Sequence, residues 1–323
     1  MTGAVMVESE RKGLDEKMLR LRLEIGKRVI GSERIVRFML ISILTENHIL
    51  LEGVPGLAKT RLANEFARHL GLDFKRIQFT PDMLPTDVMG NYVLNLQTRK
   101  MEFREGPVFT NVLLADEINR TPPKVQSALL ESMEEKQVSS NGRMHPLPEP
   151  FFVIATQNPI EQEGTFPLAE ALLDRFLFRY RMTYPTREDE LKAVRTSLDA
   201  GERPEFFTAE EIMSLRQTVK DVHVSDEVSE YVVDLIRHTR KAKGVFLGAS
   251  PRTSVKYIRA IRANALLCGR DYVLPDDVKF IAYEMLNHRL ILQPEMHLES
   301  DNEPLAVMNA VINGIIKDVK VPR

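Results

Sequence analysis

The chain lacks the features of an exported, membrane-bound or disulfide-stabilised protein. Its 323 residues include one cysteine, Cys268, which excludes an intramolecular disulfide and a zinc site built from several cysteines. No apolar run approaches the roughly 18 residues that a membrane-spanning helix needs, and the start of the chain carries Glu8, Glu10 and Arg11 where a secretion signal would be apolar. We therefore expect a soluble protein of the reducing cytoplasm.

A large charge of one sign is also missing. The formal net charge of −2 argues against a protein that binds nucleic acid through its overall charge. The chain is long enough for two domains, because single cores rarely grow much beyond about 250–300 residues.

The hydrophobic pattern divides the chain into two parts. From Ile49 to about Tyr184, short apolar runs alternate with helical stretches, which predicts a covered and largely parallel sheet. The clearest strands are 49–51, 112–115, 151–156 and 176–180. After residue 185 the chain consists of amphipathic helices. We predict an α/β domain over residues 1–185, beginning with helices, and a smaller all-helical domain over residues 186–323.

A glycine-rich turn between a predicted strand and a predicted helix is typical of a phosphate-binding loop. Its residues are Gly53, Val54, Pro55, Gly56, Leu57, Ala58, Lys59 and Thr60, followed by Arg61. In such a loop the backbone amides and the helix N-terminus surround the β-phosphate, the lysine reaches the β/γ oxygens, and the threonine hydroxyl ligates Mg²⁺. The alternative is an ordinary turn between two core elements. Ala58 replaces the usual glycine, so we expect a helical backbone there instead of a positive φ.

Two acids follow a buried strand at residues 112–115. Asp116 can hold Mg²⁺ together with Thr60 and phosphate oxygens, and Glu117 can orient or deprotonate the attacking water. The alternative is a helix that begins with two acids. Asn158 follows the next strand, where its amide could donate to the γ-phosphate and hold the water. Outside this setting, Gln-Asn-Pro is more often a turn.

Five motifs in this order resemble those of AAA+ ATPases, and among them the MoxR family. They are Gly53–Thr60, Leu114 to Arg120 (LADEINR), Ala155 to Pro159 (ATQNP), Glu170 to Phe176 (EALLDRF) and Ser250-Pro251-Arg252. Ala58 agrees with this, since MoxR-type loops resemble Gly-x-Pro-Gly-x-Ala-Lys-Thr. The resemblance covers nearly the whole chain, from about Ile30. It implies an AAA+ P-loop domain with a helical lid domain, and hydrolysis of ATP with Mg²⁺.

The resemblance also assigns roles to residues. Asn158 matches the first sensor, and Arg252 matches the second sensor, which contacts the γ-phosphate of its own subunit. Val29, Ile30 and Gly31 fall where the family places its adenine-side contacts.

Arg175 matches the family's arginine finger, which reaches into the nucleotide site of a neighbouring subunit. A guanidinium supplied in trans stabilises the charge that spreads over the transferred phosphoryl group. The alternative is a structural ion pair with Asp174 or Glu170. If Arg175 is a finger, the functional unit is a ring or at least a dimer, and we expect a ring of identical subunits, a hexamer.

Three further segments have open roles. The resemblance identifies residues 80–105 with a helix-2 insert and residues 137–149 with a hairpin before the first sensor; both could contact a pore or partner, or be ordinary surface hairpins. Residues 235–270 contain nine cations and no acid. They could bind nucleic acid, but their few aromatic side chains favour an orientation toward the nucleotide and the large domain.

The resemblance implies a chaperone-like machine that remodels or matures a partner protein, with metal or cofactor insertion as one use and a von Willebrand factor A domain protein as partner. One alternative is a DNA- or RNA-acting motor or loader, which only the basic segment supports. Another is a nucleotide-gated module without turnover. The presence of Glu117, Asn158 and Arg175 together argues against that module.

Overall fold

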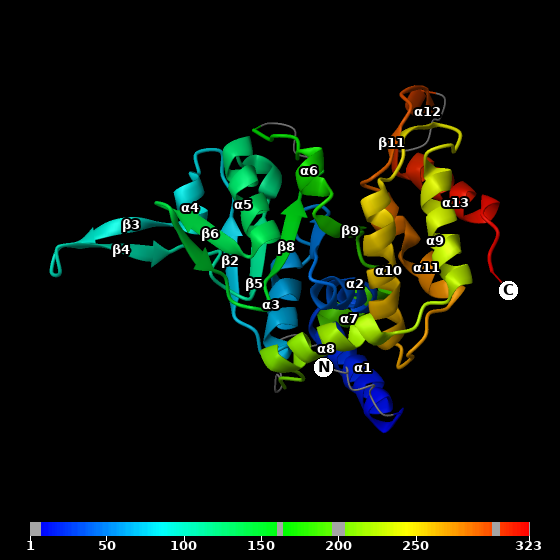
Figure 1. The fold of residues 1–323 in the computed structure, drawn as a ribbon, viewed down its shortest axis with the longest axis horizontal. Helices are drawn as coiled ribbons and strands as arrows, with labels where there is room; N and C mark the ends of the chain where they lie inside the picture. Colours follow the sequence, from blue (N-terminus) through cyan, green and yellow to red (C-terminus); the bar gives the residue numbers. More distant parts are fainter. Residues whose placement is uncertain (1–7, 160–163, 196–203, 299–303, 323) are drawn as a thin grey trace. The chain divides into compact units, whose positions relative to one another are not determined.

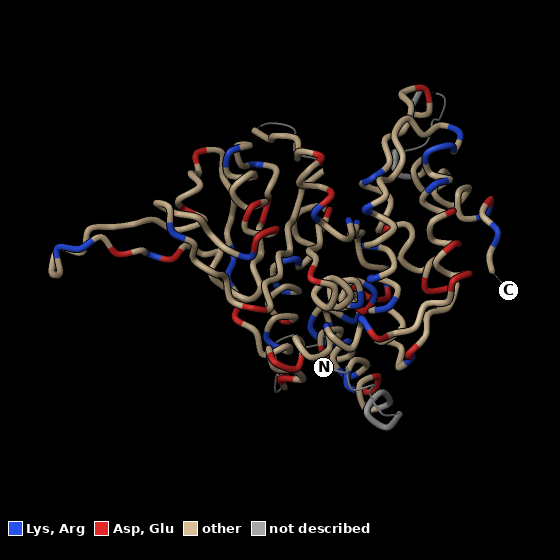
Figure 2. Tube along the Cα trace, in the orientation of Figure 1, with Lys and Arg blue, Asp and Glu red and all other residues tan. Residues whose placement is uncertain are grey.

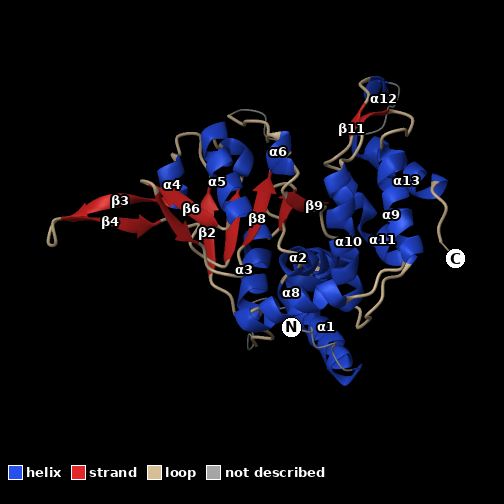
Figure 3. Ribbon diagram, viewed as in Figure 1, coloured by secondary structure: helices blue, strands red, loops and turns tan. Residues whose placement is uncertain are grey.

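The computed structural model describes residues 8–159, 164–195, 204–298 and 304–322. Contacts within the chain define two compact units. One contains Leu19–Phe176 and Tyr180–Ser214, and the other contains Met1–Met18, Leu177–Arg179 and Leu215–Arg323. The boundary expected after residue 185 stays a prediction. Figure 3 shows that the second unit consists mainly of helices.

A five-stranded sheet is the framework of the α/β part, with the strand order β2-β5-β8-β1-β9. Its strands are β1 (His48–Glu52), β2 (Phe74–Gln78), β5 (Val112–Asp116), β8 (Phe152–Gln157) and β9 (Phe176–Arg181). The pairs β2–β5, β5–β8 and β8–β1 are parallel. The predicted parallel sheet is therefore confirmed.

The strands differ in burial, which explains which of them the sequence reveals. Every residue of β5 is buried, and β1 and β8 are buried except at their last residue, because helices cover both faces of the sheet. Strand β2 lies at an edge and buries only Ile77. Its polar sequence hid it from the hydrophobic pattern, and it was not predicted.

The α/β part also contains the helices α2 (Glu33–Leu44), α3 (Lys59–His69), α5 (Pro123–Glu135), α6 (Glu170–Leu173) and α7 (Arg187–Arg195). Helix α1 (Glu8–Arg28) crosses the boundary between the two units. Helix α3 packs on β2 and β5, and α2 packs on β1. The helix that follows the phosphate loop is therefore fixed against the strand that ends in the two acids.

Two antiparallel hairpins leave this framework. The first joins β3 (Gly90–Asn95) and β4 (Lys100–Glu105) after the short helix α4 (Pro85–Met89), and it extends away from the sheet (Figure 1). The second joins β6 (Gln137–Ser140) and β7 (Arg143–Pro146) through Asn141 and Gly142, both with positive φ, as the predicted Asn-Gly turn requires. The two hairpins contact each other through the rings of Phe103 and His145, which stack with centroids 3.8 Å apart.

The second unit contains a helical bundle, as predicted. Its helices are α9 (Asp226–Thr239), α10 (Pro251–Leu266), α11 (Pro275–Leu286), α12 (Glu295–Leu298) and α13 (Pro304–Asp318), and α8 (Ala209–Asp221) crosses the unit boundary. Helix α10 packs between α9 and α11. A small antiparallel pair, β10 (Val245–Leu247) with β11 (Ile291–Leu292), corrects the all-helical expectation; strands this short leave no periodic pattern. Among the described residues, no helix has the length and apolar character needed to cross a membrane.

Candidate nucleotide and hydrolysis site

Strand register brings the predicted site residues to one edge of the sheet. Strand β8 lies between β5 and β1, with Ala115 opposite Ala155 and Leu51 opposite Thr156. The phosphate loop follows β1, Asp116 ends β5 with Glu117 directly after it, and Asn158 follows β8 and is buried. The carboxyl ends of parallel strands are where α/β sheets bind ligands. Three of the predicted motifs thus meet at one place.

The phosphate loop runs from Gly53 to Ala58, and α3 begins at Lys59. Gly56 has a φ of +88°, and the Lys59 ammonium donates to the Gly53 carbonyl oxygen at 2.6 Å. Ala58 has φ 54° and ψ 26°, so it lies in the left-handed region and the expectation of a helical backbone was wrong. The geometry of the loop requires a positive φ at this position even when the residue is not glycine. For alanine, this conformation costs about 1–2 kcal/mol.

These features fit a phosphate group. No described side chain caps α3, and its first turn of Lys59, Thr60 and Arg61 contains no acid. The free amide groups at a helix N-terminus, the helix dipole and the lysine all favour an anion. Val54 and Pro55 complete the loop on the β1 side.

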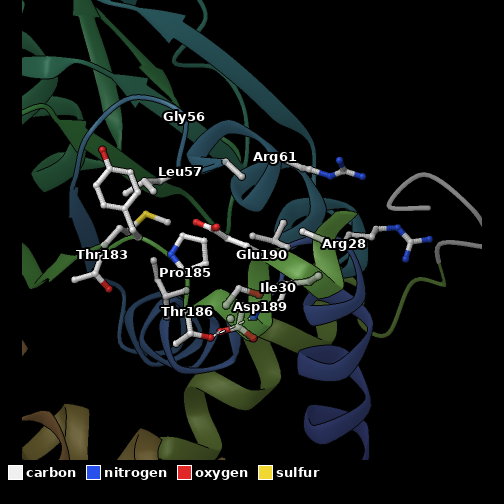
Figure 4. A pocket seen from close by; sticks show the side chains of 18 of the residues that line it. Arg28, Ile30, Gly56, Leu57, Arg61, Thr183, Pro185, Thr186, Asp189 and Glu190 are labelled. Atoms are coloured by element: carbon white, nitrogen blue, oxygen red, sulfur yellow. Dashed lines mark hydrogen bonds between the residues drawn. The ribbon is translucent and has the colours of Figure 1, made fainter. Parts of the chain in front are cut away.

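A cavity of about 390 Å³ lies beside the loop (Figure 4). Its walls come from residues 28–32, from Gly56, Leu57, Ala58 and Arg61, and from residues 180–186 with the start of α7. Val29, Ile30 and Gly31 therefore lie next to the phosphate loop, and a volume of this size suits a nucleoside. Their contact with adenine stays a prediction. The 180–190 wall, with Glu190 and the hydrogen-bonded pair Thr186 and Asp189, was not predicted.

A buried cluster of three polar side chains lies beside this cavity. Arg28 Nε lies 3.3 Å from Glu65 Oε2, and His69 Nε2 lies 3.7 Å from the same oxygen. All three side chains are nearly inaccessible to solvent. Because Glu65 and His69 belong to α3 and Arg28 borders the cavity, the cluster connects the Arg28 wall of the cavity to the helix that follows the phosphate loop.

Asp116 is buried at the end of β5, and both of its carboxylate oxygens accept hydrogen bonds. Oδ1 accepts a hydrogen bond from Thr156 Oγ1 at 2.6 Å. Oδ2 accepts from Arg76 Nε at 3.0 Å and from Arg76 Nη2 at 2.7 Å. This is a buried acid with a dedicated counter-ion, a chemistry that also suits a divalent cation.

Glu117 is held by three groups. Its backbone lies in the left-handed region, with φ 57° and ψ 49°. Its amide N–H donates to Thr156 Oγ1 at 2.8 Å, and its Oε2 accepts from Gln78 Nε2 at 2.7 Å and lies 2.9 Å from Arg120 Nε. The short 3₁₀ helix Ile118–Arg120 follows. The strained backbone turns Glu117 out of the strand direction, a conformation typical of functional positions.

Arg175 pairs with a partner that sequence reasoning did not consider. The structure joins it to Glu134 of α5 in place of the expected Asp174 or Glu170, and both side chains are partly exposed. The two residues are distant in sequence, which is why no local pattern indicated the pair. An exposed ion pair of this kind is worth about 0–1 kcal/mol, so it can open readily.

Arg252 lies in the other unit, in the first turn of α10, whose first residue is Pro251. Its role as second sensor stays a prediction. Several cations of the 235–270 segment have internal partners: Arg240 binds the Ala249 carbonyl, Arg262 binds the Lys220 carbonyl, and Arg270 binds Asp277 through two nitrogens. Figure 2 shows that acids lie among the basic residues of this unit. These contacts favour a structural use of the segment over nucleic-acid binding.

Sequence reasoning missed three polar side chains at the hydrolysis site. Thr156 was part of a motif without a role, and Arg76 and Gln78 lie on the unpredicted strand β2. Because side chains alternate between the two faces of a strand, Arg76 and Gln78 lie on the same face of β2. That signal becomes useful only once β2 is known to pair with β5, with Gln78 opposite Asp116.

Comparisons with known proteins agree with this geometry. The family model "ATPase family associated with various cellular activities (AAA)" matches residues 48–178, and an AAA lid domain model matches residues 237–306. The chain is 42% identical to the chaperone MoxR1 of Mycobacterium tuberculosis over 90% of this chain and 80% of that one. The chain belongs to the MoxR family of AAA+ ATPases. It is therefore a chaperone-like AAA+ ATPase that binds and hydrolyses ATP.

Two further proteins are similar to the chain over nearly its whole length. The Bacillus subtilis protein YeaC is 45% identical to this MoxR-family ATPase over 92% of each chain. A crystal structure of a Cytophaga hutchinsonii protein superimposes with a TM-score of 0.88 at 39% identity, covering 98% of both chains. A solved structure thus combines an α/β part and a helical part as this chain does.

Proposed function

We propose that this MoxR-family ATPase works as a ring of identical subunits, a hexamer, that uses ATP hydrolysis to remodel or mature a partner protein. The observation that carries the proposal is the meeting of the phosphate loop, the two acids and Asn158 at one sheet edge. Nucleotide binding alone needs neither a water-activating acid nor an amide beside it, so this set points to turnover.

In this proposal, each polar group at the sheet edge has one task. Lys59 and the loop amides hold the phosphates, and Thr60 and Asp116 hold Mg²⁺, which neutralises charge on the phosphate oxygens. Glu117 orients the attacking water and accepts its proton, and Asn158 donates to the γ-phosphate. Arg252 supplies a second positive charge from the lid domain.

Arg175 is the residue whose proposed role requires a neighbouring subunit. Its ion pair with Glu134 is partly exposed, so a neighbouring subunit's phosphates can compete for the guanidinium at small cost. The client side of the proposal rests on the chaperone name of a relative and on the family resemblance. It comprises a client protein, a partner with a von Willebrand factor A domain, and maturation by metal or cofactor insertion.

Mixing two inactive variants tests the ring and its finger. An Arg175→Ala subunit keeps its own nucleotide site, and a Lys59→Ala subunit keeps its finger. If the finger acts in trans, mixed assemblies regain part of the ATPase activity that each variant lacks alone. Mixtures as inactive as the two separate proteins would contradict the finger. A monomer whose size does not change with ATP and Mg²⁺ would contradict the ring, and ATPase activity stimulated by DNA would favour a nucleic-acid motor.

A further inference from the structure

The two acids of the hydrolysis site belong to one continuous polar network. Arg76 Nη2, which binds Asp116, also donates to Gln78 Oε1 at 2.6 Å. Gln78 Nε2 in turn donates to Glu117 Oε2 at 2.7 Å. Two neighbouring positions on one face of β2 therefore connect the acid expected to hold the metal with the acid expected to activate water.

The acceptor capacity of Asp116 is nearly used up. A carboxylate offers about four lone-pair positions, and three of them accept hydrogen bonds, one from Thr156 and two from Arg76. A hydrated Mg²⁺ needs the same oxygens, either directly or through its water. The cation and the Arg76 guanidinium therefore compete for Asp116.

The two partners in this pair differ in exposure. The Asp116 side chain is 11% exposed and needs a counter-charge, because an unpaired buried carboxylate is costly. The Arg76 side chain is 46% exposed and lies on an edge strand. Arg76 can move into solvent when another cation takes its place, whereas Asp116 cannot.

We propose that Arg76 is an internal counter-ion that occupies Asp116 until a divalent cation displaces it. The inference deepens the proposed function, since it rests on Asp116 as a metal ligand. When Arg76 moves away, Gln78 Oε1 loses its hydrogen-bond donor, and the hydrogen bond from Gln78 Nε2 to Glu117 changes. Metal binding at Asp116 thereby alters the position of Glu117, which makes Arg76 and Gln78 positioning residues.

Binding of Mn²⁺ tests this competition without relying on turnover. Mn²⁺ is titrated by electron paramagnetic resonance against the full chain saturated with a non-hydrolysable ATP analogue, with the analogue alone as reference. Arg76→Gln should lower the Mn²⁺ dissociation constant by about tenfold, because the lost charge-assisted hydrogen bonds are worth roughly this factor. Lys75→Gln is the matched control: it removes the same charge from the neighbouring residue of β2, whose side chain points to the other face, and should change the constant by less than about twofold.

Each outcome decides the question. Equal constants for Arg76→Gln and Lys75→Gln, or weaker binding by Arg76→Gln, would overturn the inference and leave the metal site intact. Wild type that binds Mn²⁺ no better than the analogue alone would overturn the proposed metal site as well. If Arg76→Gln does not fold, Arg76→Lys replaces it. Lysine keeps the charge but loses the two-pronged contact, so Mn²⁺ should bind about two- to threefold more tightly than to wild type, and an unchanged constant would refute the competition.

Discussion

The Thr156 hydroxyl contacts both acids directly, so it offers the sharpest test of the hydrolysis site. The hydroxyl donates to Asp116 Oδ1 at 2.6 Å and accepts from the Glu117 amide at 2.8 Å. Thr156 itself is completely buried. Thr156→Val keeps the shape of the side chain and removes only these two hydrogen bonds.

The expected loss of stability follows from the two bonds. A neutral hydrogen bond contributes about 1 kcal/mol and a bond to a charged group about 1.5–3 kcal/mol, and water cannot reach the buried partners to replace them. The free energy of unfolding should therefore fall by about 3 kcal/mol. Asp116 keeps Arg76 on its other oxygen, which prevents a larger loss.

The loss of activity has a separate cause. Glu117 occupies a left-handed backbone conformation that costs about 1–2 kcal/mol, and the Thr156 hydroxyl fixes its amide there. Without that bond Glu117 relaxes away from the attacking water, and kcat should fall by about 100-fold while the KM for ATP changes little.

Chemical denaturation and steady-state ATPase kinetics measure the two effects. Thr156→Ser keeps the hydroxyl and serves as the control, with kcat close to that of wild type. The reasoning is refuted if Thr156→Val loses less than about 1 kcal/mol of stability and retains a kcat within about twofold of wild type.

Three further predictions concern other parts of the chain. Ala58→Gly removes the strain of an alanine in the left-handed region but increases the conformational entropy of the unfolded chain. The free energy of unfolding should therefore rise by about 0–1 kcal/mol. A clear fall in this free energy, measured by denaturation, would contradict the strained loop. Glu65→Gln removes the charge of the buried acid closest to Arg28, so it should cost about 3 kcal/mol of the free energy of unfolding and raise the KM for ATP. Glu24→Gln, at a partly exposed acid 4.0 Å from Arg28, should cost under about 1 kcal/mol. Equal effects of the two substitutions would contradict the role of the buried pair. Burial raises the pKa of Tyr257 well above its usual 10.0, so the unfolded chain loses this proton at a lower pH than the folded chain. The free energy of unfolding should therefore fall as the pH rises above 10.0. In Tyr257→Phe this free energy should fall less steeply with pH, and the same pH dependence in both proteins would contradict the assignment.

The features that could be predicted from the sequence are those formed by residues that are contiguous in the chain. The phosphate loop, the strand that ends in Asp116 and Glu117, and the Asn-Gly hairpin each combine a local hydrophobic pattern with characteristic polar residues. The strong burial of β1, β5 and β8 made the sheet edge predictable as well.

The parts that escaped prediction depend on pairing between distant segments. Arg76 reaches Asp116 only because β2 pairs with β5, and Arg175 meets Glu134 only through the packing of α5. The backbone of Ala58 escaped for a different reason: the geometry of the loop imposed a positive φ on a residue whose own preference opposes it. The backbone preference of a single residue is overridden where the surrounding structure determines its conformation.

The central claim is that Glu117 activates water at a site where Lys59 and the loop hold ATP. Its most direct test is the turnover of Glu117→Gln, measured together with ATP affinity and beside Lys59→Ala. Because the amide cannot accept the proton, we predict a kcat at least about 100-fold below wild type with ATP affinity retained, whereas Lys59→Ala loses affinity. A turnover of Glu117→Gln indistinguishable from that of wild type would contradict the account.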